Sequence, residues 1–165
     1  MRTRVIRALS LAAVIAMLGT GTALADAGGR GTVTGTQQDR NVVLFSMPVL
    51  NPCTGASGTL TAVAATEVFH FTLFTNGDEF WVTGTAQGTA TFTPDDPAGI
   101  SASGHFATWF GESSNERNDV QHDTNTFVLN GTDGSRVIVH ATDHLSTNAN
   151  GDVTVSFSTF RFHCG

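Results

Sequence analysis

Histidines, acids and tryptophans are the residues of this sequence whose types and spacing come closest to a chemical site. His140 and His144 stand four positions apart, a spacing that on a helix brings two imidazoles to one metal ion. The alternating apolar residues around them predict a strand, in which residues four apart lie about 13 Å from each other. Such a pair cannot share a zinc ion, which binds nitrogen at about 2.1 Å. The sequence therefore predicts no metal site, and it leaves open only that a histidine of a neighbouring strand, such as His105, pairs with one of the two.

Serines, acids and histidines are all present, but no G-x-S-x-G elbow or other nucleophile motif surrounds any serine. Two carboxylates flanking a glycosidic bond can hydrolyse it, and Asp123 and Asp143 are acids that a fold can bring face to face. The sequence does not give their separation. We therefore expect a protein without a catalytic site or a cofactor, with a small secreted enzyme as an alternative.

The two tryptophans fall on the polar side of their predicted strands. Trp81 alternates in phase with Thr83 and Thr85, and Trp109 alternates in phase with His105. An indole ring on a face rich in hydroxyl groups can stack on a sugar ring, because it joins an apolar body to a polar N–H group. Trp81, Trp109 and His105 are therefore the predicted ligand-binding residues of a carbohydrate-binding module. The alternative is that both tryptophans plug the mouth of a barrel or pack under a loop.

Arginine supplies all eight basic residues, and three of them lie within the first seven positions. The other five oppose fourteen Asp and Glu residues, which leaves a net charge of −9 once the first residues are removed. A chain of this charge has no basic stripe for phosphate groups. Nucleic acid and anionic lipid surfaces are therefore not expected partners.

The first residues predict export. A positive head is followed by the apolar run from Ala8 to Leu18, which is shorter than the roughly twenty residues that span a bilayer. Ala23-Leu24-Ala25 fits the A-x-A cleavage pattern, so residues 1–25 are predicted to be a secretory signal peptide. We expect a secreted, extracellular protein that no membrane holds after cleavage.

The clearest strand signal runs from Phe80 to Thr93. Small and apolar residues alternate there with threonine and glutamine, which is the period of two that a strand requires. A straight strand of this length would be too long for a small domain, so we expect it to bend at Gly84 or Gly88. Because the apolar side chains at its centre are small, phenylalanines from across the core are expected to fill the space.

Similar runs recur along the chain between turn motifs such as Asn76-Gly77-Asp78 and Asp133-Gly134-Ser135, and they predict about eight strands. Two of these are separate strands, one near Gly58 to Ala65 and one over Phe69 to Leu73. Short connections favour antiparallel pairing, and closure of an eight-stranded meander removes its edges. We expect an all-β, antiparallel up-and-down barrel over residues 41–165, with a two-sheet β-sandwich as the alternative and residues 26–40 as a flexible segment. An eight-stranded barrel has room for one small ligand, and the many phenylalanines favour an apolar one.

Cys53, in the stretch NPCTG, and Cys164, next to the last residue, are the only two cysteines. The cysteines of an exported protein are expected to pair. The pair would close a loop of about 110 residues, which contributes roughly 4–5 kcal/mol in the chain-entropy model. Such a bridge would tie the last strand to an early one. Two free thiols, or a bridge to another chain, are the alternatives.

Several short motifs extend over nearly the whole predicted mature chain: NPCTG, Asp95-Asp96-Pro97, Trp109-Phe110-Gly111-Glu112, Asp133-Gly134-Ser135, His140, Asn148-Ala149-Asn150-Gly151 and the terminal Cys-Gly. Together with the signal peptide, they resemble a group of small secreted proteins of uncharacterised function from actinobacteria. The resemblance implies export and a Cys53–Cys164 bridge. It implies no activity, because these motifs are turn and disulfide features.

Overall fold

The computed structural model describes residues 31–74 and 79–165, which form one antiparallel sheet of eight strands. The strands are β1 (Thr32–Asp39), β2 (Val42–Leu50), β3 (Ser57–Phe74), β4 (Phe80–Pro94), β5 (Ala102–Ser114), β6 (Asn118–Gly131), β7 (Arg136–Asn148) and β8 (Val153–Cys164). The predicted signal peptide and the predicted turn at Asn76-Gly77-Asp78 lie outside the described residues. Within the described part, no helix is long and apolar enough to cross a membrane.

The strands follow one another across the sheet in the order β1-β3-β4-β5-β6-β7-β8, and each pairs antiparallel with the next. β1 and β2 pair with different halves of β3: Thr32 to Asp39 lie opposite Phe74 to Glu67, and Val42 to Leu50 lie opposite Ala64 to Ser57. The prediction of an all-β, up-and-down antiparallel fold is therefore confirmed. The sheet does not close into the expected barrel, because β8 forms one edge while β1 and β2 form the other.

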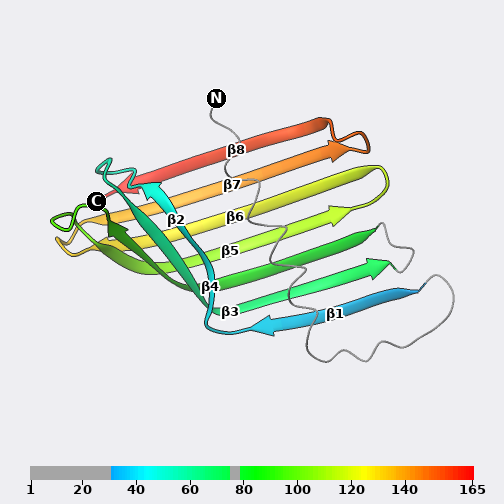
Figure 1. Ribbon diagram of the computed structural model, residues 1–165, viewed down its shortest axis with the longest axis horizontal. Coiled ribbons are helices and arrows are strands. Elements are labelled where there is room, and N and C mark those ends of the chain that lie inside the picture. The colour runs from blue at the N-terminus through cyan, green and yellow to red at the C-terminus, as the bar shows by residue number, and fades with distance from the viewer. Residues whose placement is uncertain (1–30, 75–78) are drawn as a thin grey trace.

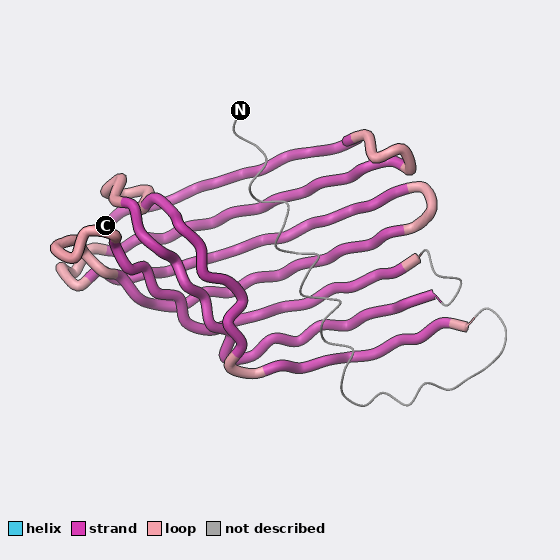
Figure 2. Tube along the Cα trace, viewed as in Figure 1, coloured by secondary structure: helices cyan, strands magenta, loops and turns pink. Residues whose placement is uncertain are grey.

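One end of the sheet curls over itself, so that β2 and the adjoining halves of β3 and β4 lie in front of the flatter strands (Figures 1 and 2). The bend coincides with a shift of register in the β3–β4 pair between Ala64 and Thr66. On β4 the residue at this point is Gly88, where an added Cβ atom would overlap the backbone oxygen of Val63. The predicted bend is thus present at Gly88, where only a residue without a side chain allows the two backbones to approach so closely.

The curl gives the sheet a concave face and an outer face. The core lies inside the curl, where small side chains of β3 and β4, such as Ala62, Ala86 and Ala90, pack against Phe106 and Phe127. The outer face carries the alternate residues of these strands and of β5, which are rich in threonine on β4 and include Trp81 on β4 and Trp109 on β5. As the sequence predicts, bulky phenylalanines pack over the small residues at the centre of β4.

Two details differ from the sequence-based expectation. Residues 32–39 form β1, although they fall within the segment expected to be flexible. β3 is a single strand of 18 residues, where the sequence predicts two separate strands. The reason is the bulge near Ala65, because one extra residue moves the inward-facing positions from Ala62 and Ala64 to Glu67 and Phe69 and so interrupts the period of two.

Candidate ligand-binding cavity

A cavity of about 350 Å³ lies inside the curl, between β2 and the concave face of β6, β7 and β8. Its walls are almost entirely apolar. β2 contributes Phe45, Met47 and Val49, and the opposite wall includes Phe127, Val139 and Phe160. Cavities of at least about 300 Å³ with such walls are typical of sites for small molecules.

Aromatic contacts connect the two walls where no backbone pairing does. The Phe45 ring on β2 meets the Phe127 ring on β6 edge-to-face, with centroids 6.2 Å apart. Phe127 in turn stacks on Phe106 at 5.9 Å. Phe45 takes this position because the β2–β3 register shifts between Val43 and Phe45, which leaves both Leu44 and Phe45 packed against the core. The bulge therefore aims a large side chain across the curl.

The cavity reaches the surface along the seam between the two edges of the sheet. Phe160 of β8 and Leu50 of β2 both line the cavity, yet 56% of the Phe160 surface and 69% of the Leu50 surface are exposed. Every residue of β8 is exposed, and this strand has a partner on one side only. A ligand would therefore enter between β2 and β8, and its binding would cover apolar surface that is now in water.

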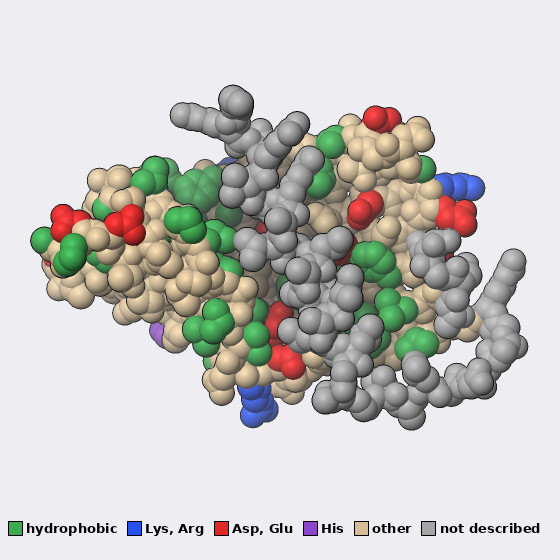
Figure 3. All heavy atoms as spheres, viewed as in Figure 1, with side chains coloured by type: hydrophobic (Ala, Val, Ile, Leu, Met, Phe, Trp, Pro, Cys, Tyr) green, Lys and Arg blue, Asp and Glu red, His purple; other side chains and the backbone are tan. Residues whose placement is uncertain are grey.

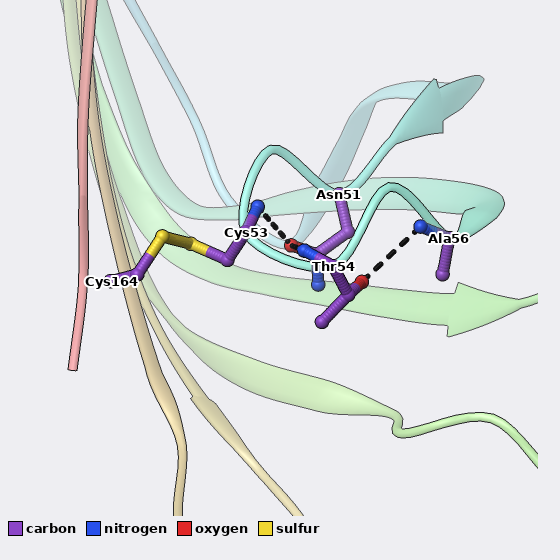
Figure 4. Close-up of a disulfide and its surroundings, with 5 residues drawn as sticks. All are labelled: Asn51, Cys53, Thr54, Ala56 and Cys164. Carbon is purple, nitrogen blue, oxygen red and sulfur yellow. Dashed lines mark hydrogen bonds between the residues drawn. A yellow bond between two sulfur atoms is a disulfide. The ribbon is translucent and has the colours of Figure 1, made fainter.

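A disulfide holds the seam together at one end. Cys53, in the loop after β2, is bonded to Cys164 at the end of β8, and their Cα atoms are 5.8 Å apart (Figure 4). The loop is shaped by Asn51, whose side-chain oxygen accepts hydrogen bonds from the backbone N–H groups of Cys53 and Thr54. The predicted bridge is confirmed, and it joins the two sheet edges that hydrogen bonds leave apart.

Two amide side chains, Asn51 and Asn125, bring polar groups to this apolar lining. The Asn125 amide nitrogen donates a hydrogen bond to Oδ1 of Asp123 at 2.8 Å. The Asn125 carbonyl oxygen, the remaining polar atom of this side chain, is an acceptor for a ligand that carries a hydrogen-bond donor. Apart from these two amide side chains, the cavity lining is apolar.

Asp123 and Asp143 lie directly opposite each other on β6 and β7, as the sequence analysis considers for a pair of acids. Burial is the main cause that raises the pKa of Asp123 above its usual value, and the charge of Asp143 raises it further. The Asn125 hydrogen bond and His122 act in the opposite direction. The two residues are cross-strand neighbours on the concave face, beside Asn125, which lines the cavity.

Other acids extend this negative region over the concave face. Burial raises the pKa of Glu67, with a contribution from Asp39, and burial also raises the pKa of Glu112. Figure 3 shows acidic and apolar side chains together on this side of the molecule, while histidines are almost absent from the view. The six acids that the strands carry on this face are Asp39, Glu67, Glu112, Asp119, Asp123 and Asp143. A ligand that approaches the cavity from this face meets negative charge.

The predicted ligand-binding residues Trp81, Trp109 and His105 lie on the outer face and not in the cavity. Trp81 is 46% exposed and Trp109 is 43% exposed, so neither plugs the curl or packs under a loop. They occupy adjacent strands, with Trp81 opposite Ser113 and Trp109 opposite Thr85. His105 is exposed four residues before Trp109 on β5, which places it about 13 Å along the strand.

The residues that line the cavity could not be identified from the sequence. The bulge in β2 interrupts the period of two next to Phe45, and the sequence does not show that β2 and β8 approach each other without pairing. The contact between His122 and His144 is also not among the sequence-based predictions. A signal for this contact exists, because both residues are equally far from Asp133 at the centre of the predicted β6–β7 turn.

No family model matches the chain, and no curated protein or solved structure gives a significant match.

Proposed function

We propose that this protein is a secreted, non-catalytic β-domain that binds a small apolar ligand in the cavity between β2 and β8. The observation that carries the proposal is the apolar volume of about 350 Å³ lined by Phe45, Phe127 and Phe160. This volume opens to water along the seam between β2 and β8. A ligand that fills it would remove apolar wall surface from water, which favours binding.

The charge around the cavity narrows the class of ligand. Asn125 lines the cavity and donates a hydrogen bond to Asp123, which lies opposite Asp143. An alcohol or an amine can donate a hydrogen bond there, and an ammonium group also gains from the negative charge. A carboxylate would place like charges together and lose affinity. The proposed ligand therefore has a medium-length apolar body and a neutral or cationic head.

Export of the protein is part of the proposal and rests on the predicted signal peptide. The Cys53–Cys164 bridge is compatible with it, since disulfides persist in oxidising compartments outside the cytosol. An open apolar cavity would also suit an extracellular carrier, which binds a poorly soluble molecule and so removes it from water.

Native mass spectrometry of protein purified from its own host tests the proposal. We expect a species heavier than the bare chain by the mass of one small molecule, together with a rise in melting temperature when an octyl amine or alcohol is added. A clean apo mass, and no thermal shift across a panel of apolar metabolites, would overturn the proposal.

A second candidate function is carbohydrate binding on the outer face. The observation that favours it is the exposure of Trp81 and Trp109 among threonine side chains, because sugar rings stack on exposed indoles. Pull-down on insoluble chitin, cellulose and peptidoglycan tests it. We expect retention that is lost in Trp81→Ala and Trp109→Ala, while equal retention of these variants and the unmodified chain removes the mechanism.

A further inference from the structure

All six histidines of the chain are on the outer face of the sheet, but only two of them face each other. His122 of β6 and His144 of β7 are direct cross-strand partners, and their Nδ1 atoms are 3.3 Å apart. The others have different neighbours: His70 meets Thr36 and His140 meets Thr126. His105 lies between Thr89 and Val128, and His163 lies opposite Ile138. His122 and His144 are also half-buried, whereas the other four are exposed.

Aromatic rings hold this pair in place from both sides. The Trp109 indole of β5 packs edge-on against His122, with centroids 5.2 Å apart. The Phe157 ring of β8 stacks on His144 at 5.3 Å with an interplanar angle of 17°. The four rings form a row across four strands, so each imidazole has little freedom to turn. A pair of ligands fixed in this way loses little entropy when it binds an ion.

The distance between the two nitrogens matches a coordination sphere. Zinc binds histidine nitrogen at about 2.0–2.1 Å in a tetrahedral arrangement, which sets neighbouring ligand nitrogens about 3.3–3.4 Å apart. The observed 3.3 Å equals that edge, and it is longer than most hydrogen bonds, which lie near 2.7–3.2 Å. One ion can therefore bind both Nδ1 atoms when each ring carries its proton on Nε2.

We propose that His122 and His144 form a two-histidine site for Zn²⁺ on the outer face, flanked by Trp109 and Phe157. Among the described residues, no group of three or more His, Cys, Asp or Glu side chains converges on one point. The remaining coordination positions are therefore filled by water or by a ligand from outside the protein. The site is independent of the apolar cavity, which opens on the opposite face.

Isothermal titration of the full chain, produced without a histidine tag, with ZnCl₂ tests the site. We expect one Zn²⁺ per chain. His122→Gln and His144→Gln each remove a direct ligand of the ion. We expect each variant to bind Zn²⁺ at least about tenfold more weakly, because loss of a residue that only hydrogen-bonds to a metal ligand already weakens binding about tenfold. His140→Gln is the matched control, because His140 lies on the same strand and face as His144 but contacts Thr126. We expect this variant to bind Zn²⁺ as tightly as the unmodified chain.

Nitrogen-15 NMR of the histidine rings provides a second readout that does not depend on the stability of a variant. Addition of Zn²⁺ is expected to shift the Nδ1 resonances of His122 and His144 and to leave those of the other four histidines in place. The proposal is overturned if no Zn²⁺ binds, if both glutamine variants bind as tightly as the unmodified chain, or if other ring nitrogens shift instead.

Discussion

Half-buried carboxylates on the concave face are the residues whose protonation the fold alters most clearly. Burial and the neighbouring Asp143 raise the pKa of Asp123 above its usual 3.8. A raised folded-state pKa means that the protonated form favours the folded state. This stabilisation is fully present below pH 3.8 and is lost as the pH rises through the folded-state pKa, so charged Asp123 lowers stability at neutral pH.

Replacement of Asp123 by asparagine removes this charge and keeps a side-chain oxygen for the Asn125 hydrogen bond. We expect Asp123→Asn to raise the melting temperature at pH 7, and the difference from the unmodified chain to shrink toward pH 4. Asp133→Asn is the control, and we expect it to change the melting temperature at pH 7 in the opposite direction, because hydrogen bonds from Ser135 lower the pKa of Asp133. Thermal melts between pH 4 and pH 7 give the answer. A lower melting temperature of Asp123→Asn at pH 7 would contradict this account of the concave face.

The same acids are expected to select the head group of a ligand. Octylamine and octanol should displace the neutral probe N-phenyl-1-naphthylamine from the cavity, and octanoate should do so much more weakly, because its carboxylate meets Asp123 and Asp143. Competition titrations at pH 7 measure the order. In Asp123→Asn the disadvantage of octanoate should decrease, and an unchanged or reversed order would show that the head group does not lie near these acids.

At the scale of the strands, alternation predicts an element where one face is apolar along its whole length. It identifies β4 because Val82, Ala86 and Phe92 alternate with threonines. It does not identify β1, because the inward residues of that strand include Gly35, Gln37 and Asp39. Hydrogen bonding to β3, and not burial of an apolar face, keeps β1 in the sheet. Alternation also divides β3 in two, since the bulge near Ala65 changes which residues face inward.

The sequence predicts the register of two paired strands where the turn between them is symmetric. Asp133-Gly134-Ser135 is a tight turn, with Gly134 at a φ of 86°, and residues equally far from Asp133 pair across β6 and β7. This rule places Asp123 opposite Asp143 and His122 opposite His144. The sequence does not predict the cavity, because the cavity depends on the distance between β2 and β8, and no turn connects these two strands.

The bend between β3 and β4 makes a separate prediction. Gly88→Ala places a Cβ atom against the Val63 carbonyl oxygen, so one backbone must move, at a cost of about 1–3 kcal/mol. Chemical denaturation measures the loss. Gly111→Ala is the control, because its Cβ atom would first meet the Trp109 side chain at 3.3 Å, and a side chain can shift. Equal stability of the two variants would mean that Gly88 does not permit the bend.

For the whole molecule, the disulfide replaces the row of hydrogen bonds that would close a barrel. The bridged residues are 111 positions apart, so the bond contributes about 4–5 kcal/mol through the unfolded state. We expect Cys53→Ser with Cys164→Ser to lower the melting temperature by about 10–20 °C and to weaken binding of N-phenyl-1-naphthylamine by loosening the seam. Reducing agent should lower the melting temperature of the unmodified chain equally and have no effect on the double variant. A double variant that melts like the unmodified chain would contradict this role.

The two faces of the molecule have different chemistry because the sheet has one layer over most of its width. The concave face combines apolar side chains with six strand-borne acids, and the outer face carries all six histidines and both tryptophans. The curl encloses only one end of the concave face, and there the cavity forms. The proposed apolar ligand and the proposed metal ion therefore occupy opposite sides of the sheet and can be tested separately.

Titration with N-phenyl-1-naphthylamine tests the central claim, that the cavity is a ligand site. Ala141 of β7 lines the cavity, while Ala107 of β5 is exposed on the outer face, so Ala141→Phe fills the cavity and Ala107→Phe adds the same ring elsewhere. We predict one probe per unmodified chain, affinity at least about tenfold weaker in Ala141→Phe, equivalent to about 1.4 kcal/mol, and no change in Ala107→Phe. No probe binding to the unmodified chain, or equal affinity in all three proteins, would contradict the claim.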